Sequence, residues 1–392
     1  MPPPPRTPRR WRPFAKLWHR WFGILGGLWL LLLALTGSAI TYYDELDRWL
    51  NPDWRSIPVA ATTQAPLDAV ISRADDALPG FVANNILLPT GPTDTIWILG
   101  RAPLSGTPRP VQLFADPRDG AVLGWRVSGE VTLDRRHAMD IVYGLHVDLL
   151  AGAWMTWFFG LVSLAWTIDH AIALWLALPR GAKWLQAFAV AGRKRSLRRL
   201  FDLHRAPGMW AWPVTFVVAL TGVTLAWPET SRDAVALVSP IGGRLDEAWP
   251  EVDPPADPVG IERAIAAVTP DRSRVHSVRI LPDHAAYAVR TYNPRDVDYQ
   301  GRLWTYVSMA DARPFARRHD IGDSAGDLFF AWQYALHSGQ IFGPVGRLLI
   351  FLSGIVATAL VLTGYWLWWR RRRGGKRASN ARPPVSVVTP AP

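Results

Sequence analysis

Four long apolar stretches predict four membrane-spanning helices. They lie at roughly 21–43, 153–178, 209–227 and 348–369, and each is nearly free of charged side chains. A helix needs about 20 such residues to cross a bilayer. Four buried helices of a large soluble core are the alternative, but core helices are usually shorter and carry one polar face. We therefore expect a polytopic membrane protein.

The two long segments between these stretches follow one plan. Each starts with a short amphipathic helical pattern, at 67–79 and at 259–270. A strand-like run follows in each, at 96–99 and at 286–289, and turn-forming residues such as Asp116–Gly120 come next. We expect two small α+β domains.

Positive charge is concentrated beside the apolar stretches. Residues 1–20, 179–200 and 370–392 carry six, seven and seven Lys or Arg and no Asp or Glu, in a chain of net charge +11. Basic segments next to spanning helices mark the cytoplasmic side, so both termini are expected inside and the α+β domains outside. Contact with the lipid bilayer accounts for this charge, and no nucleic-acid partner is expected.

The predicted organisation follows from these patterns. The first apolar stretch is too long for a cleavable signal and lacks a small-residue cleavage site, so it is expected to be retained. The chain has no cysteine, which excludes disulfides, thiolate metal sites and cysteine nucleophiles. In chain order we expect a disordered tail (1–15), helix 1 (16–43), an outside domain (44–140), helix 2 (141–178), a basic loop (179–200), helix 3 (201–227), a second outside domain (228–330), helix 4 (331–369) and a basic tail (370–392).

Matching motifs recur in the two halves. A His-Arg pair precedes Ala-Leu-Thr-Gly, and eighteen residues separate histidine from glycine both for His19 and for His204. A Leu-His pair precedes a glycine by six residues both at His146 and at His337. The shared order and spacing favour duplication of a unit made of helix, outside domain and helix.

The sequence resembles a known family in these segments. WHRWFGILGGLWLLLLALTGS, FDLHRAPGMWAWPVTFVVALTGV, LHSGQIFGPVGRLL and LTGYWLWWRRRR are similar to the PepSY-associated transmembrane family, over essentially the whole chain between the tails. That family includes iron-regulated inner-membrane proteins and ferric-siderophore reductases of Gram-negative bacteria. The resemblance implies a membrane α-helical protein with four helices, two periplasmic α+β PepSY-like domains and, in its reductase members, haem b held by histidines.

Topology pairs the histidines. His19 and His204 begin helices at the cytoplasmic edge, whereas His146 and His337 lie at the outer ends of the other two helices. Two ligands of one haem iron must lie at one depth, so the expected pairs are His19 with His204 and His146 with His337, one haem b for each pair. The alternative is that these histidines are interfacial polar residues and that His-Arg belongs to the positive-inside signal.

Four further residues are candidates near the two haems. Arg20 and Arg205 follow the inner histidines and could meet haem propionates. Arg347 could reach an outer propionate or extend to the interface. His170 lies roughly 12 Å inside the bilayer and has no counterpart in the second half. It is either an inner ligand in place of His19 or His204, a proton or electron relay, or a neutral hydrogen-bonded residue of the bundle.

The outer pair raises a question of depth. The apolar core of helix 4 begins near Leu348, eleven residues after His337, which could lift this histidine about 16 Å above the hydrocarbon. Two haems at such extremes would be too far apart for easy electron transfer. Helix breaks at Gly152, Gly339, Gly343 or Pro344 could bring the outer site down.

The other histidines are expected to be ordinary. His276, His284 and His319 are predicted at the surface of the outside domains, and His137 faces away from His146.

The expected function is a haem-containing reductase of the bacterial inner membrane. It would pass electrons from an unknown cytoplasmic or quinol donor to a ferric siderophore or similar chelate, releasing Fe(II). No acid–base or nucleophile constellation is evident, so no catalytic side chain is assigned. The alternatives are a non-enzymatic PepSY membrane protein that binds a peptidase or envelope partner, and an accessory of siderophore uptake.

Overall fold

The chain divides into two compact units, which we describe separately. The computed structural model describes residues 11–380 except Thr62, Arg180, Gly192, Arg195 and Arg244. We call the first unit, Met1–Leu35, Leu161–Leu220 and Leu352–Pro392, the helical unit. We call the second, Thr36–Gly160 and Thr221–Phe351, the sheet unit.

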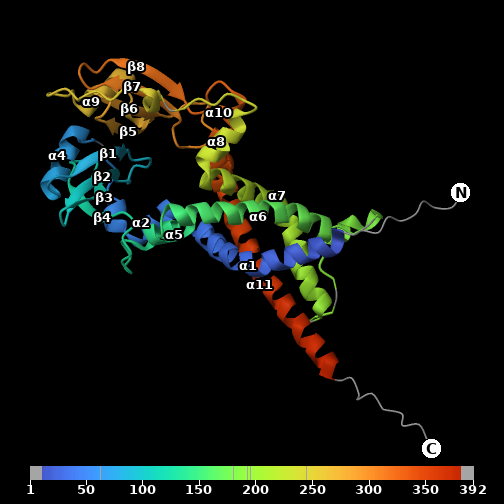
Figure 1. Cartoon of the computed structure of the whole chain (residues 1–392). Coiled ribbons are helices and arrows are strands. Elements are labelled where there is room, and N and C mark those ends of the chain that lie inside the picture. Colours follow the sequence, from blue (N-terminus) through green and yellow to red (C-terminus); the bar gives the residue numbers. More distant parts are fainter. Residues whose placement is uncertain are drawn as a thin grey trace, which may run out of the picture. The chain divides into compact units, whose positions relative to one another are not determined.

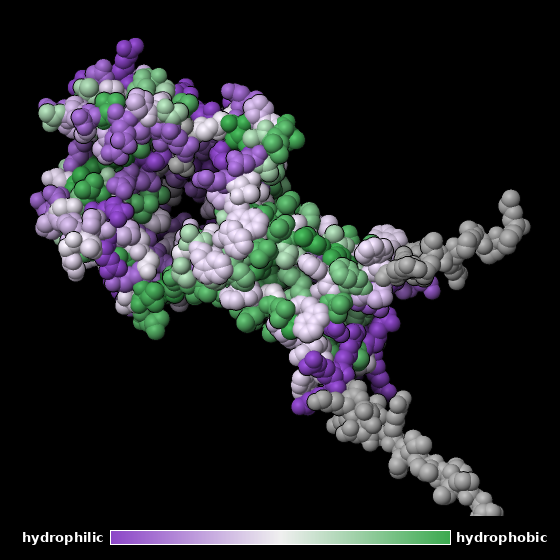
Figure 2. All heavy atoms as spheres, in the orientation of Figure 1, coloured by the Kyte–Doolittle hydropathy of each residue, from purple (hydrophilic) through white to green (hydrophobic). Residues whose placement is uncertain are grey.

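Four helices in the described part of the chain are long and apolar enough to cross a membrane, as the sequence predicts. They are α1 (Trp11–Ile40), α6 (Ala153–Ala177), α7 (Leu197–Ala226) and α11 (Gly343–Asn380). Hydrophobic side chains gather over these helices, whereas the surface of the sheet region is mainly hydrophilic (Figure 2). The length and apolar composition of these four helices therefore indicate a membrane protein.

Three of these helices extend beyond the predicted ends. Helix α7 begins at Leu197, within the expected basic loop. Helix α1 begins at Trp11, so residues 11–15 of the expected tail are helical. Helix α11 continues to Asn380 through the arginine-rich run, since arginine is a good helix former. Residues 1–10 and 381–392 of the expected tails lie outside the described residues.

The predicted helices 2 and 4 are each interrupted near a histidine. Helix α5 (Ala138–Val147) ends before α6, and between them Leu149, Leu150 and Gly152 have positive φ. Helix α10 (Ala325–Ser338) ends at Gly339, whose φ of 78° forms a left-handed C-cap before the 3₁₀ turn η4 (Gln340–Phe342). Three of the four expected break points thus have backbone conformations that end a helix: Gly152, Gly339 and Gly343.

The two predicted α+β domains share one sheet. All pairings are antiparallel, and the strand order is β4-β3-β2-β1-β5-β6-β7-β8 (Figure 1). Strands β1 and β5 join the halves through the pairs Asn85–Arg279, Ile86–Val278 and Leu87–Ser277. The strands are β1 (Val82–Leu87), β2 (Ile96–Leu104), β3 (Thr107–Ala115), β4 (Val122–Val127), β5 (Val275–Leu281), β6 (Ala286–Thr291), β7 (Leu303–Ser308) and β8 (Pro314–His319).

One helix from each half packs on this sheet, as the amphipathic patterns predict. Helix α4 (Leu67–Ala77) and helix α9 (Ile261–Val268) contribute Leu67 and Ile261 to a common core. Their N-termini cap each other: Asp68 Oδ1 accepts from Ile261 N at 2.7 Å, and Glu262 Oε1 accepts from Leu67 N at 2.8 Å. The two expected α+β domains therefore form one folded body within the sheet unit.

Short elements complete the chain. They are α2 (Tyr43–Leu50), α3 (Pro52–Arg55), α8 (Pro228–Ala236) and the 3₁₀ segments η1 (Gly181–Phe188), η2 (Leu245–Ala248) and η3 (Arg272–Arg274).

Candidate functional site

The predicted inner histidines face each other in the helical unit. His19 on α1 and His204 on α7 have ring centres 6.1 Å apart, with an interplanar angle of 59°. A histidine nitrogen lies about 2.1 Å from a bound metal and its ring centre about 1.1 Å further, so two axial histidines of one iron have centres about 6.4 Å apart. The spacing of this pair matches that value.

Both inner histidines are oriented through Nδ1. His19 Nδ1 is 2.9 Å from the carboxylate of Asp169, which is buried on α6. His204 Nδ1 lies 3.0 Å from the Leu360 carbonyl oxygen and 3.1 Å from Thr363 Oγ1 on α11. Such acceptors hold the proton on Nδ1, so Nε2 carries the lone pair that binds a metal.

Glycines bring helices close to the inner pair. A Cβ added to Gly364 on α11 would lie 3.4 Å from His204 Cε1, and one added to Gly208 would lie 3.3 Å from Leu360. Small residues let helix backbones approach closely in membranes. A Cβ at Gly364 would thus be in van der Waals contact with His204, so α11 passes directly beside this ring.

His170 lies in the same unit but has both nitrogens engaged. Its Nδ1 is 2.8 Å from the Trp166 carbonyl oxygen, and its Nε2 is 3.0 Å from Thr215 Oγ1. The ring is 6 % exposed and packs against Trp166 at 5.1 Å and Phe216 at 5.8 Å. Of the three roles considered from the sequence, the geometry favours a hydrogen-bonded residue of the bundle.

The predicted outer histidines face each other in the sheet unit. His146 and His337 occupy the last turns of α5 and α10, and their ring centres are 6.3 Å apart at 56°. His146 Nδ1 is 3.1 Å from Thr36 Oγ1, and His337 Nδ1 is 2.9 Å from Thr221 Oγ1. The spacing again matches two axial ligands of one iron, and the threonine orients the ring in each case.

The Ala-Leu-Thr-Gly motif, which marks the repeat in the sequence, also contacts the outer histidines. Its threonine bonds the outer histidine, and its glycine leaves room for it, since a Cβ on Gly37 would lie 2.9 Å from His146 Cε1. Leu362-Thr363-Gly364 repeats the last three residues and serves His204 in the same way. This third copy is visible in the sequence and would have pointed to Thr363.

The three candidate arginines differ in their surroundings. Arg20 is exposed beside Trp21. Arg205 is bound to Asp202 at 2.9 Å and to the Gln186 carbonyl oxygen at 2.7 Å. Arg347 is bound to Glu45 at 2.7 Å and to the Thr41 carbonyl oxygen. Arg20 is thus the least constrained of the three.

Two of the histidines predicted at the surface are buried, so that prediction is wrong for them. His276 on β5 and His319 on β8 are each 8 % exposed. The ring of His276 packs against Tyr292, with ring centres 5.7 Å apart. His319 Nε2 lies 3.0 Å from Asp296. Burial, together with the positive charge of the nearby Arg290, lowers the pKa of His276 to about 4.

Comparison with known families identifies the chain. The model of the PepSY-associated TM region matches residues 17–371. The chain belongs to the PepSY-associated transmembrane family. This match confirms the resemblance seen in the sequence, and it includes all four paired histidines. A search of curated proteins finds no matching relative.

Each histidine pair offers two imidazole ligands. Within the described residues, no group of three or more His, Cys, Asp or Glu is placed to bind a metal ion. The histidine pairs offer two ligands each, whereas a structural zinc ion needs four. Two facing histidines suit an iron whose other four ligands come from a porphyrin.

Proposed function

We propose that this PepSY-associated membrane protein is a reductase of the bacterial inner membrane that transfers electrons to a ferric chelate in the periplasm. The observation that carries the proposal is the recurrence of one geometry: two histidine pairs with ring centres at 6.1 and 6.3 Å, each ring oriented through Nδ1. Each pair takes one histidine from each half of the chain. This symmetry is the expected product of duplication, and chance placement of interfacial histidines does not account for it.

Haem b, one molecule at each pair, would supply a one-electron Fe(III)/Fe(II) carrier. His19 and His204 would ligate one iron through Nε2, and His146 and His337 the other. Thr36, Thr221, Thr363 and Asp169 would fix the rings and so preorganise the ligands. Two histidines on one iron leave no open position, which suits electron transfer rather than oxygen chemistry.

The basic segments give the proposed direction. They lie in the sequence near the helix ends that carry His19 and His204, which under the positive-inside rule supports a cytoplasmic position of this pair and a periplasmic sheet unit. One electron from a cytoplasmic or quinol donor reduces one chelated Fe(III) to Fe(II). The hard oxygen ligands of a siderophore bind Fe(II) less tightly, so the metal is released.

A difference spectrum tests the proposal. The protein is purified from haem-replete cells, and the dithionite-reduced minus oxidised spectrum is recorded; we expect the bands of bis-histidine haem b. His→Ala at positions 19, 146, 204 and 337 should each reduce the haem-to-protein ratio. His284→Ala is the matched control, since His284 belongs to neither pair and its Nδ1 lies 3.2 Å from the Pro250 carbonyl oxygen.

Two outcomes contradict the proposal. A well-folded protein without a Soret band would favour a non-enzymatic PepSY protein that binds an envelope partner. Loss of haem only in His170→Ala would show that the proposed pairing is wrong.

A further inference from the structure

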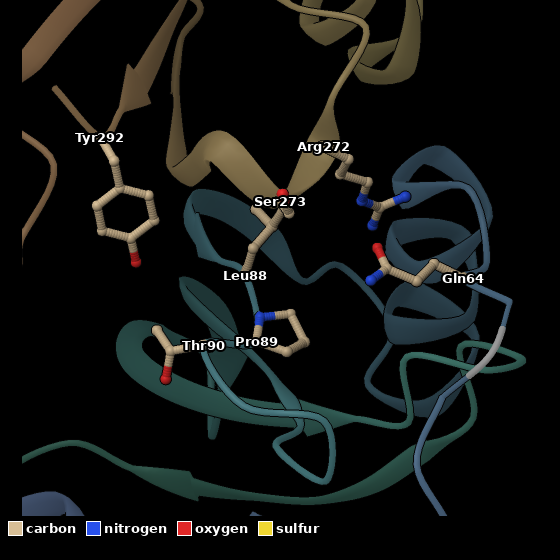
Figure 3. A pocket seen from close by; sticks show the side chains of 7 residues that line it. All are labelled: Gln64, Leu88, Pro89, Thr90, Arg272, Ser273 and Tyr292. Carbon is tan, nitrogen blue, oxygen red and sulfur yellow. The ribbon is translucent and has the colours of Figure 1, made fainter.

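Two cavities of the sheet unit meet at Tyr292. The smaller has a volume of about 210 Å³ and is bordered by Gln64, Thr90 and Arg272 besides Tyr292 (Figure 3). The larger has about 510 Å³ and includes Arg274 and Ile341. Small-molecule sites usually occupy about 300–1,000 Å³, so the pair is large enough for a compact ligand.

The smaller cavity contains a guanidinium with unused donors. Arg272 Nη1 binds Glu262 at 2.8 Å and the Ala65 carbonyl oxygen at 3.1 Å. Its Nε and Nη2 are buried and have no acceptor among the residues that the structure describes. Buried polar groups almost always have partners, so these two donors indicate a missing acceptor, which is an oxygen-bearing ligand or water.

Figure 3 places further polar groups around this space. Arg272 and Gln64 lie on one side of the cavity, and Tyr292 and Thr90 lie on the other, with the Tyr292 hydroxyl directed toward the cavity. Burial raises the pKa of Tyr292, so its hydroxyl keeps its proton and acts as a donor. The T-shaped contact of its ring with buried His276, at 5.7 Å, fixes the side chain.

The larger cavity adds a second arginine. Arg274 is exposed at its rim, and its carbonyl oxygen accepts from Tyr292 N at 2.9 Å. The two aspartates of the wall already have partners: Asp298 forms an ion pair with Arg302, and Asp296 forms a hydrogen bond with His319 at 3.0 Å. The cavity therefore offers hydrogen-bond donors and the positive charge of Arg274 to a ligand. The carboxylates of Asp296 and Asp298 are already engaged by other side chains.

This cavity also borders the chain that carries an outer histidine. Ile341 belongs to η4, four residues after His337. Gln300 Nε2 bonds Gln340 Oε1 at 3.2 Å and ties the neighbouring loop to the same turn. A ligand in the larger cavity thus lies against the segment that directly follows the proposed outer site.

We propose that the two cavities flanking Tyr292 form one binding site for an anionic, oxygen-rich chelate of the catecholate or carboxylate class. Arg272 and Arg274 bind the negatively charged oxygens, and Tyr292 donates a hydrogen bond between them. The assignment of this ligand as the substrate rests on the proposed reductase function, whereas binding itself does not. A cationic ferric trihydroxamate is disfavoured by the same two arginines.

Binding of a redox-inert analogue tests the site without reference to haem. Full-length protein in detergent is titrated with gallium(III) tricatecholate and the dissociation constant is measured by equilibrium dialysis. Arg274→Gln and Arg272→Gln should each weaken binding roughly 10–100-fold, the effect of losing a hydrogen bond to a charged group, and Tyr292→Phe roughly fivefold. Arg317→Gln, on an exposed arginine of β8, is the matched control and should bind as the wild type does.

The outcomes separate the site from the reductase function. Three outcomes each overturn the proposed site. They are equal binding by Arg274→Gln and Arg317→Gln, absence of binding by the wild type, and equally tight binding of a cationic gallium trihydroxamate. Arg274 is exposed, so its variant remains informative even where Arg272→Gln fails to fold. If the protein binds the gallium chelate but contains no haem, the proposed binding site stands and the proposed reductase function is refuted.

Discussion

His19 and Asp169 form a histidine–carboxylate pair, with Nδ1 and the carboxylate oxygen 2.9 Å apart. Among the described residues, the acceptors near Nδ1 of the facing His204 are neutral: the Leu360 carbonyl oxygen and Thr363 Oγ1. Asp169 occupies the position that matches Leu360 under the 191-residue offset between the halves. A side-chain carboxylate in one half thus takes the place of a backbone carbonyl in the other, and the two ligands of the proposed inner site differ in basicity.

Asp169→Asn should raise the reduction potential of the inner haem. The negative charge of Asp169 stabilises the ferric state through His19, and its removal should shift the potential upward by about 60 mV, a tenfold change in a one-electron equilibrium. A spectroelectrochemical titration that resolves the two haems measures the shift. Asp233→Asn, on an exposed acid of α8, should leave both potentials unchanged, and a downward shift for Asp169→Asn would contradict this role.

Thr36→Val and Thr221→Val should each weaken haem binding at the outer pair. The substitution keeps the side-chain shape but leaves an Nδ1–H without the acceptor seen here, at a cost of about 1–3 kcal/mol. The haem-to-protein ratio under limiting haem should fall accordingly. Thr167→Val is the control, since this hydroxyl bonds only the Ser163 carbonyl oxygen of its own helix among the contacts described. Equal haem content in all three variants would show that the threonines do not orient the ligands.

The sequence predicts the four helices and both histidine pairs because these features depend on local pattern. A run of about 20 apolar residues is sufficient for a spanning helix, and the spacing from histidine to glycine is the same in both halves. The partners of the rings were not predicted, since Thr36 and His146 are 110 residues apart and no periodicity links them. The same limit applies to the β1–β5 pairing of Ile86 with Val278, which joins two domains that the sequence pattern treats as separate. Burial of His276 was not predicted either, because its ring neighbour Tyr292 directly follows a different strand, β6.

Asp68→Ala and Glu262→Ala should each destabilise the sheet unit. Each acid accepts from a backbone N–H at the N-terminus of the helix in the other half, and loss of such a cap costs about 1 kcal/mol. Thermal unfolding of the full-length protein in detergent should show a lower Tm for both variants. Asp76→Ala, which removes an exposed acid of α4, serves as the control. A Tm unchanged from that of the control would mean that the reciprocal caps do not join the halves.

Three glycine substitutions test how closely the helices approach the histidines. A Cβ at Gly37 would lie 2.9 Å from His146 Cε1, a contact that real structures essentially never show, so Gly37→Ala should displace the ring. A Cβ at Gly364 would lie 3.4 Å from His204 Cε1, which is ordinary van der Waals contact, so Gly364→Ala should have a smaller effect. Gly23→Ala is the control on α1, where nothing lies within 4 Å of the added Cβ and alanine favours the helix.

Two quantities should therefore change most in Gly37→Ala, less in Gly364→Ala and not in Gly23→Ala. They are the haem-to-protein ratio and the g values of the low-spin haem EPR signals. This order follows from distance alone, because all three changes add one methyl group within a long apolar helix. A larger loss in Gly364→Ala than in Gly37→Ala would mean that haem binding tolerates movement of His146 more readily than movement of His204, which would contradict the equivalence of the two pairs.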